Sequence, residues 1–190
     1  MRNIMNRFTL EKTPLSGLLV LKRQPLADDR GYFERLFCEN DLREALSGKR
    51  IAQINHSFTL KQGTVRGMHF QRPPCAETKI VTCLRGEVWD VAVDVRRGSP
   101  TFLVWHGEIL SARNCRSLLI PEGFAHGFQT LTDDCALLYM HTEPFNQASE
   151  AALSAIDPRL AIAWPNPITG RSPRDEKHPM IADDFTGITL

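Results

Sequence analysis

The chain has 190 residues, 42% of them hydrophobic, with 23 Lys and Arg against 22 Asp and Glu and a formal net charge of +1. This length predicts one domain, residues 1–190, with its own core. The near-zero charge disfavours nucleic-acid and anionic-membrane partners, and there is no run of about 18 apolar residues that could span a bilayer. The sequence therefore predicts a cytoplasmic protein that binds neither nucleic acid nor membrane.

Short segments rich in β-branched and aromatic residues recur along the chain, and Gly, Pro, Asn and Asp separate them. Segments of this length are typical of β-sandwiches and barrels rather than of βαβ units. The predicted strands are 18–21, 32–37, 51–60, 64–70, 79–84, 88–95, 102–110, 117–120, 127–131 and 136–141. We therefore expect a mostly β fold.

A few short segments fall outside this strand pattern. Asn40 can cap a helical turn over 41–46, and 150–156 is rich in Ala and Leu, so both favour helix. The tail 165–179 has four prolines and is expected to lie extended on the sheets. We expect these segments to be accessory to the β-structure.

Two strands carry an unusual polar pattern. In 88–95, period-two alternation places Asp90 and Asp94 on one face, which must be polar or line a cavity. In 64–70, strict alternation separates Arg66 from His69, unless a bulge at Gly67 brings both side chains to one side. A glycine at this position is compatible with such a bulge.

Residues 120–128 contain Pro121, Gly123 and His126 in the spacing PxGxxH. This spacing is similar to the second metal-ligand motif of cupins and favours a cupin-type jelly-roll β-barrel with a few short helices. A metal cupin also needs an HxH pair and a carboxylate, whereas the first polar run supplies His69 alone. The sequence therefore predicts no bound metal, and a metal-dependent cupin remains an alternative.

Inward histidines without a metal are suited to acid-base chemistry, because neutral imidazole accepts a proton near physiological pH. A proton that imidazole can remove lies next to a ketone, and Lys79 and His126 are candidates to hold the enolate oxygen. Tyr139 is a candidate acid, and Asp175 is a candidate to orient a histidine. The competing interpretations are that His69 is a structural histidine, Tyr139 a core aromatic and Asp175 part of a solvated turn.

Taken in order, these motifs resemble the dTDP-4-dehydrorhamnose 3,5-epimerase family over nearly the whole chain. No single motif is decisive, but their number and order make the resemblance specific. The matching positions are 29–33, 53–57, 66–71, Lys79, 90–94, 98–101, 120–128, Tyr139, Glu150, 157–158, 162–165 and 172–175.

The resemblance implies a homodimer that acts on a nucleotide-diphosphate sugar without a cofactor. It implies epimerisation of dTDP-4-dehydro-6-deoxy-D-glucose at C5 and then C3, giving dTDP-4-dehydro-L-rhamnose for deoxysugar biosynthesis. His69 would be the base, paired with Asp175, and Tyr139 the acid. The substrate-binding positions it implies are Arg30, Gln53, Asn55, Arg66, Lys79, His126, Glu150 and Arg174.

Three positions depart from the family's usual pattern. Arg35 stands where members usually carry Glu, with Glu34 one residue earlier, and Phe145 stands where many have a second aromatic hydroxyl. Arg174 replaces a common Lys, which keeps the charge but changes its geometry. A single-centre C3 or C5 epimerase on a related sugar nucleotide is therefore an alternative, as is a non-catalytic sugar-nucleotide binder.

Overall fold

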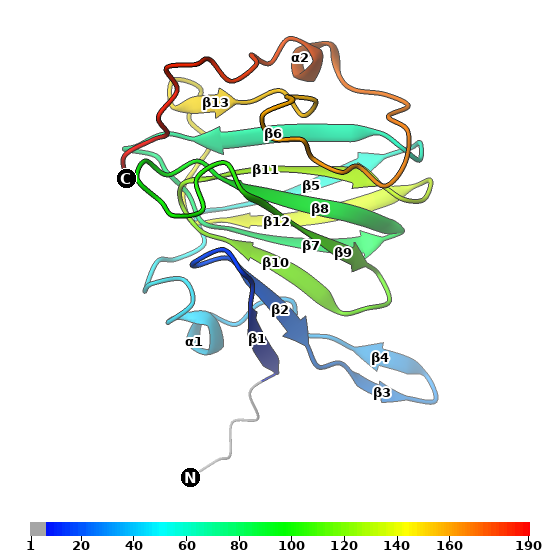
Figure 1. Cartoon of the computed structure of the whole chain (residues 1–190). Helices are drawn as coiled ribbons and strands as arrows, with labels where there is room; N and C mark the ends of the chain where they lie inside the picture. Colours follow the sequence, from blue (N-terminus) through cyan, green and yellow to red (C-terminus); the bar gives the residue numbers. More distant parts are fainter. Residues whose placement is uncertain (1–6) are drawn as a thin grey trace.

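The computed structural model describes residues 7–190 as two facing β-sheets with a small hairpin and short helices at their margins (Figure 1). In spatial order, one sheet contains β1 (Phe8–Lys12), β2 (Leu19–Arg23), β10 (Arg116–Ile120), β7 (Lys79–Arg85), β12 (Cys135–His141) and β5 (Gln53–Thr59). The other contains β13 (Glu150–Ala152), β6 (Val65–Gln71), β11 (Phe124–Thr130), β8 (Glu87–Asp94) and β9 (Trp105–Ser111). The hairpin consists of β3 (Leu26–Asp28) and β4 (Gly31–Phe33).

The predicted mostly β architecture is confirmed, and each predicted strand segment overlaps a strand of the structure. Within residues 7–190, no ladder joins the two large sheets into a closed barrel, so the jelly roll takes its double-sheet form. The sequence interpretation missed β1, β3 and β13. All three are short strands at the edge of a sheet or in the hairpin.

The helix predictions need correction. Residues 150–156 are not helical, because β13 pairs with β6 there and the sheet ladder outweighs the weak helix preference of Ala and Leu. Near residue 40 the helix is α1 (Glu39–Leu42), which begins before Asn40, so Asn40 is not its cap. In the part of the chain that the structure describes, no helix is long and apolar enough to cross a membrane.

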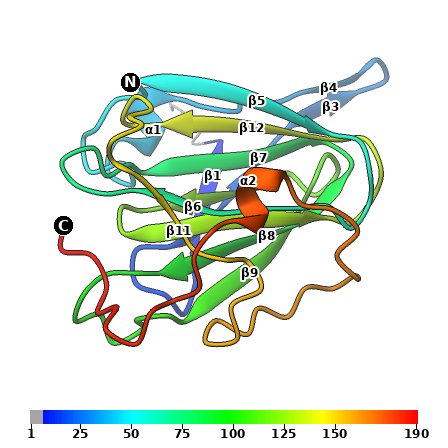
Figure 2. The same ribbon diagram turned by 90° about the horizontal axis from the view of Figure 1, so that it is seen from above.

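The tail is extended only in part, because it contains the one-turn helix α2 (Pro173–Glu176). The Ser172 hydroxyl accepts a hydrogen bond of 3.0 Å from the backbone N–H of Asp175, and Pro173 occupies the first turn. A Ser cap followed by Pro is a common start of a helix. The helical turn lies beside β6 (Figure 2), and its Asp175 side chain is buried.

The predicted alternation in β8 is confirmed. Ala92 packs in the core between the two sheets, whereas Val91 packs in a second core beneath the C-terminal segments. Asp90 and Asp94 share the inward face of the strand, and both are 0% exposed. The strand therefore carries two carboxylates into the interior, where each needs polar partners.

Candidate active site

A cavity of about 450 Å³ lies between the two sheets. Its wall includes every predicted site residue except Arg30 and Asp175. The six-stranded sheet supplies one side through β5, β7 and β12, and β6 and β11 of the other sheet supply the opposite side. The predicted residues that line it are Gln53, Asn55, Arg66, His69, Lys79, His126, Tyr139, Glu150 and Arg174.

A bulge in β6 brings Arg66 and His69 to the same cavity. The ladder with β11 pairs Arg66 with Phe128 and His69 with His126, so β6 has one extra residue between these pairs. Gly67 has φ +137°, and a Cβ there would lie 2.5 Å from the Gly127 Cα. Only glycine fits this close approach of the two strands.

His69 forms a hydrogen-bonded pair with Asp175 of α2. The Nε2 atom of His69 lies 3.0 Å from the Asp175 Oδ1, and the two side chains are 33% and 6% exposed. Burial acts to raise the pKa of Asp175, but the hydrogen bond and charge of His69 outweigh it and lower this pKa. Because an ionised carboxylate only accepts hydrogen bonds, Nε2 carries the hydrogen and Nδ1 is free to take a proton.

Tyr139 of β12 lies in the wall formed by the other sheet. Its hydroxyl shares a 3.0 Å hydrogen bond with the Ser57 hydroxyl. Burial raises the pKa of Tyr139 far above its ordinary value, and the hydrogen bond to Ser57 offsets only part of this effect. The phenol therefore remains protonated at neutral pH and can act as a proton donor.

His126 is held by a second aspartate. Its Nε2 atom lies 2.9 and 3.1 Å from the two carboxylate oxygens of Asp90. Burial raises the pKa of Asp90, although the charge and hydrogen bond of His126 act in the opposite direction. Asp94, on the same face of β8, is bonded to Arg96 of its own turn instead.

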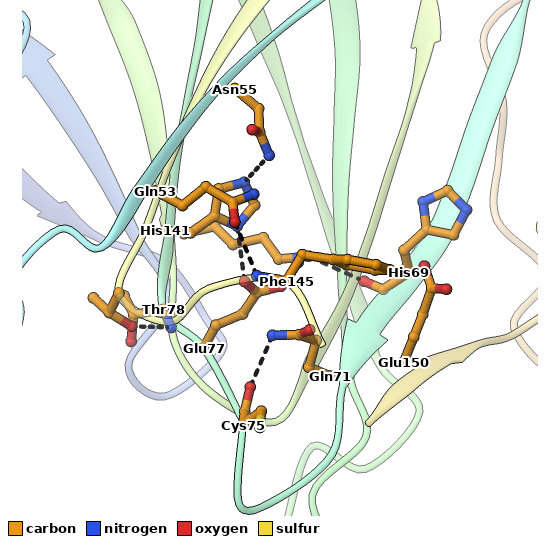
Figure 3. A network of polar contacts seen from close by, with 12 residues as sticks. Gln53, Asn55, His69, Gln71, Cys75, Glu77, Thr78, His141, Phe145 and Glu150 are labelled. Atoms are coloured by element: carbon orange, nitrogen blue, oxygen red, sulfur yellow. Dashed lines mark hydrogen bonds and ion pairs between the residues drawn. The ribbon is translucent and has the colours of Figure 1, made fainter. Parts of the chain in front are cut away.

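A polar network links Glu77, His141 and Asn55 (Figure 3), and sequence reasoning missed its first two members. The Lys79 Nζ lies 3.0 Å from the Glu77 Oε1, and the His141 Nδ1 donates to the Glu77 Oε2 at 2.8 Å. Asn55 Nδ2 then donates to the His141 Nε2 at 3.4 Å. Burial acts to raise the pKa of Glu77, but the hydrogen bonds and charges of His141 and Lys79 outweigh burial and lower this pKa. The ionised carboxylate therefore holds both the Lys79 ammonium and the His141 ring in place.

The spacing of these residues held a usable signal. Glu77 lies two residues before Lys79, and His141 lies two residues after Tyr139 on the same strand. Period-two alternation places His141 on the same face of β12 as Tyr139, whereas Glu77 lies in the loop before β7 and does not follow from a strand pattern. A third missed residue, His178, follows α2 and packs edge-on against His69, with ring centroids 5.1 Å apart.

The remaining cavity contacts define its rim. Arg174 forms an ion pair with Glu150, and Gln53 accepts a hydrogen bond of 2.9 Å from the backbone N–H of Phe145. Arg66 contacts the Thr59 hydroxyl at 3.4 Å. The cavity wall therefore combines three cationic side chains with the aromatic ring of Phe145. The cationic residues are Arg66, Lys79 and Arg174.

Arg30 lies outside the cavity of its own chain. It follows β3 in the hairpin, its side chain is 85% exposed and it pairs with Asp28. The hairpin projects away from the two large sheets (Figure 1). Glu34 is also engaged elsewhere, because it accepts a 2.7 Å hydrogen bond from Arg23.

An imidazole held through its Nε2 atom and a protonated phenol thus line one cavity together with Lys79 and His126. This arrangement can move a proton at a carbon while fixed donors stabilise charge on a neighbouring oxygen. In residues 7–190, His69, Asp175 and His178 form the one cluster whose three possible metal-ligand atoms lie within 4.8 Å of one another.

Comparison with known proteins agrees with this geometry. The family model for dTDP-4-dehydrorhamnose 3,5-epimerase matches residues 12–183. The chain is 43% identical over 155 residues to the dTDP-4-dehydrorhamnose 3,5-epimerase of Salmonella typhimurium, covering 81% of this chain and 84% of that protein. It is 36% identical over 170 residues to a dTDP-4-dehydrorhamnose 3-epimerase of Streptomyces niveus, covering 89% and 82% of the two chains.

A solved structure extends the similarity to three dimensions. The dTDP-6-deoxy-D-glucose-3,5-epimerase of Legionella pneumophila, in complex with dTDP-4-keto-L-rhamnose, superposes with a TM-score of 0.89 at 35% identity. The alignment covers 96% of this chain and 98% of that one. The fold is therefore the cupin-like fold of these enzymes, and the chain belongs to the dTDP-4-dehydrorhamnose 3,5-epimerase family of isomerases.

Proposed function

We propose that this protein epimerises a dTDP-linked 4-keto-6-deoxyhexose at both C3 and C5, giving dTDP-4-dehydro-L-rhamnose, with no metal or other cofactor. The observation that carries the proposal is that His69, held from behind by Asp175, lines one cavity together with Tyr139 and Lys79. The family match and the ligand of the Legionella relative support the choice of substrate.

The reaction needs a base, an electron sink and an acid. The His69 Nδ1 takes the C5 proton, the electron pair of the C–H bond moves toward the C4 ketone, and the oxygen becomes an enolate. Lys79 and His126 stabilise that oxygen by charge and hydrogen bonding. Tyr139 then returns a proton to C5 on the opposite face. His69 releases its proton to solvent and Tyr139 takes one from solvent, and the same sequence at C3 then completes the reaction.

The cationic side chains of the cavity suit the diphosphate of the substrate. Arg66 presents a planar guanidinium that can bind a phosphate through two parallel hydrogen bonds, and Arg174 adds a second positive charge. Gln53, Asn55 and Glu150 supply polar contacts to the remaining substrate groups. The net charge of the whole chain is close to zero, but positive side chains gather at this one cavity.

Arg30 joins this set only if two chains associate. We propose a homodimer in which the β3–β4 hairpin of one protomer carries Arg30 into the substrate cavity of its partner. The hairpin exposes Tyr32 and Phe33 at 63% and 71%, and such apolar area favours association with another chain. One arrangement of the two chains would then account for both predictions, the dimer and the role of Arg30 in substrate binding.

A mixed-dimer experiment tests this arrangement. Arg30→Ala and His69→Ala chains, each nearly inactive alone, are combined by co-expression with two different affinity tags. If Arg30 acts in the partner's cavity, each mixed dimer has one intact site and recovers activity. If Arg30 acts in its own protomer, both sites of the mixed dimer stay defective and no activity returns.

A single-centre epimerase is the second candidate, because a 3-epimerase from Streptomyces niveus is 36% identical to this chain, the same identity as one of the 3,5-epimerases. Incubation with the 4-keto sugar nucleotide in deuterated water separates the two. The proposed reaction introduces deuterium at C3 and C5, as NMR of the recovered sugar would show. Label at one carbon would establish the single-centre enzyme, and label at neither would remove the catalytic proposal in favour of a sugar-nucleotide binder.

A further inference from the structure

His178 is a second imidazole beside the carboxylate that holds the proposed base, and the reaction above assigns it no role. Its Nε2 lies 3.7 Å from the Asp175 Oδ1, the same oxygen that His69 contacts at 3.0 Å. The His178 and Asp175 side chains are only 9% and 6% exposed. Two imidazoles therefore converge on one buried carboxylate oxygen.

The tautomer of the His178 ring follows from the hydrogen bond that its other nitrogen makes, on the side away from Asp175. Nδ1 lies 3.3 Å from the backbone carbonyl oxygen of Gly67. A carbonyl oxygen only accepts, so Nδ1 carries the hydrogen and the neutral ring has its lone pair on Nε2. That lone pair faces the Asp175 oxygen, and a cation between these two acceptors would satisfy both. Metal-bound histidines are commonly oriented by this kind of outer N–H bond to a backbone carbonyl.

The distances fit a small transition-metal ion. Metal-to-ligand lengths of about 2.0–2.2 Å place neighbouring ligand atoms of a tetrahedral zinc site roughly 3.3–3.5 Å apart. The two separations from the Asp175 oxygen, 3.0 and 3.7 Å, lie on either side of that range, and all three ligand atoms lie within 4.8 Å. Two imidazoles and one carboxylate suit Zn²⁺, Co²⁺ and Fe²⁺ better than Mg²⁺ or Ca²⁺.

We propose that His69, Asp175 and His178 form a zinc-type site whose occupation reversibly inhibits the enzyme. The inhibitory part rests on the proposed function, in which His69 is the base. A metal on the His69 Nε2 needs the lone pair of that atom, so the single hydrogen of the neutral ring must reside on Nδ1. Nδ1 is the atom that would accept the substrate proton, and it is then already protonated.

Metal binding can be measured without any substrate. Metal-free full-length protein is titrated with Co²⁺, whose visible absorption reports coordination, and the bound Co²⁺ is then displaced with Zn²⁺. The test variant is His178→Gln, which keeps a side-chain N–H for the Gly67 carbonyl but lacks the imidazole ligand. The matched control is His106→Gln on β9, where His106 lies 3.6 Å from Glu108 and outside the cluster.

We expect one bound metal per chain in the wild type and in His106→Gln, and at least about a tenfold weaker affinity in His178→Gln. His178→Ala is a second variant that repeats the test with a smaller side chain. Equal Zn²⁺ affinity in wild type and in the folded His178 variant, or no Co²⁺ spectrum in the wild type, would overturn the site.

The activity assay tests the inhibitory role separately. The turnover of each protein in chelator-treated buffer serves as its own reference. Added Zn²⁺ should inhibit the wild type and His106→Gln reversibly, and should inhibit His178→Gln at least tenfold less strongly. Equal inhibition of all three would overturn the inhibitory role. If no chain were active, the proposed function would fail, while the Co²⁺ titration would still decide whether the metal site exists.

Discussion

The His69–Asp175 and His126–Asp90 pairs join the same residue types through the same ring nitrogen, at 3.0 and 2.9 Å. Their origins differ. His126 and Asp90 come from adjacent strands, β11 and β8, whereas His69 on β6 meets a carboxylate from a helical turn more than a hundred residues later. Their surroundings differ too, because His69 is 33% exposed and His126 only 7%.

This difference changes the chemistry of each carboxylate. The pKa of Asp175 is lowered, because its bond to His69 outweighs a partial burial, so the pair holds an ionised aspartate behind an accessible imidazole. The pKa of Asp90 is raised, because complete burial outweighs its bond to His126. A catalytic base needs an ionised carboxylate behind an accessible imidazole, as at His69. A histidine that only donates a hydrogen bond to a substrate oxygen can instead be held by a fully buried aspartate, as at His126. Residue type alone therefore does not assign the roles.

The largest expected effect is that of His69→Ala, which removes the proposed base. General-base catalysis typically contributes about 10² to 10⁴-fold, so we expect turnover to fall by roughly 10³-fold or more. Substrate affinity, measured by calorimetry, should change little, because the cationic side chains remain. The matched comparison is Arg66→Ala, which should raise KM more than it lowers kcat. Wild-type turnover in His69→Ala would exclude this residue as the base.

Asp175→Asn should have the next largest effect. Asn can hold the His69 ring but cannot stabilise its charged form, so we expect kcat to fall by about 10²-fold. Because both residues act as one unit, the double variant with His69→Ala should be no slower than His69→Ala alone. Multiplicative losses in the double variant would show that Asp175 acts independently of His69.

The two pairs also differ in what the sequence could predict. Alternation in 88–95 and a glycine inside 64–70 are local signals. The first correctly placed Asp90 and Asp94 together on one face of the strand, and the second allowed for the bulge that the ladder shows. The pairing of His69 with Asp175 is not local, and it came from the family resemblance. Composition cannot reveal it, because the position of α2 depends on how the tail packs against β6.

Non-local packing also explains why Glu77 and His141 were not identified from the sequence. In the ladder between β12 and β7, His141 lies opposite Lys79, and this register brings Glu77 between them. Register is set by tertiary packing, so a single strand pattern does not identify the partner. Likewise, 150–156 has the composition of a helix, but pairing with β6 makes its first part a strand.

Asp90→Asn should affect catalysis less than Asp175→Asn. The Asn amide N–H can donate to the His126 Nε2, which leaves the hydrogen of the neutral ring on Nδ1, so the ring keeps its position and a donor at the cost of about one weakened hydrogen bond. A loss of about 1 kcal/mol corresponds to roughly a fivefold lower kcat. Steady-state kinetics of both Asn variants provide the test. A larger loss in Asp90→Asn would reverse the assignment of the two pairs.

The smallest effect is on stability, and its sign distinguishes the pairs. A lowered pKa means that the Asp175 carboxylate stabilises the fold above its ordinary pKa of about 3.9, and this contribution is lost as the pH falls. A raised pKa means the opposite for Asp90, whose contribution is present below that pH and is lost as the pH rises through its folded pKa. Urea unfolding between pH 3.5 and pH 7 would therefore show the wild type gaining stability relative to Asp175→Asn as the pH rises, and losing stability relative to Asp90→Asn. Parallel curves for the two variants would contradict the opposite environments of the two carboxylates, because a matched Asp-to-Asn change removes the same titrating group from each pair.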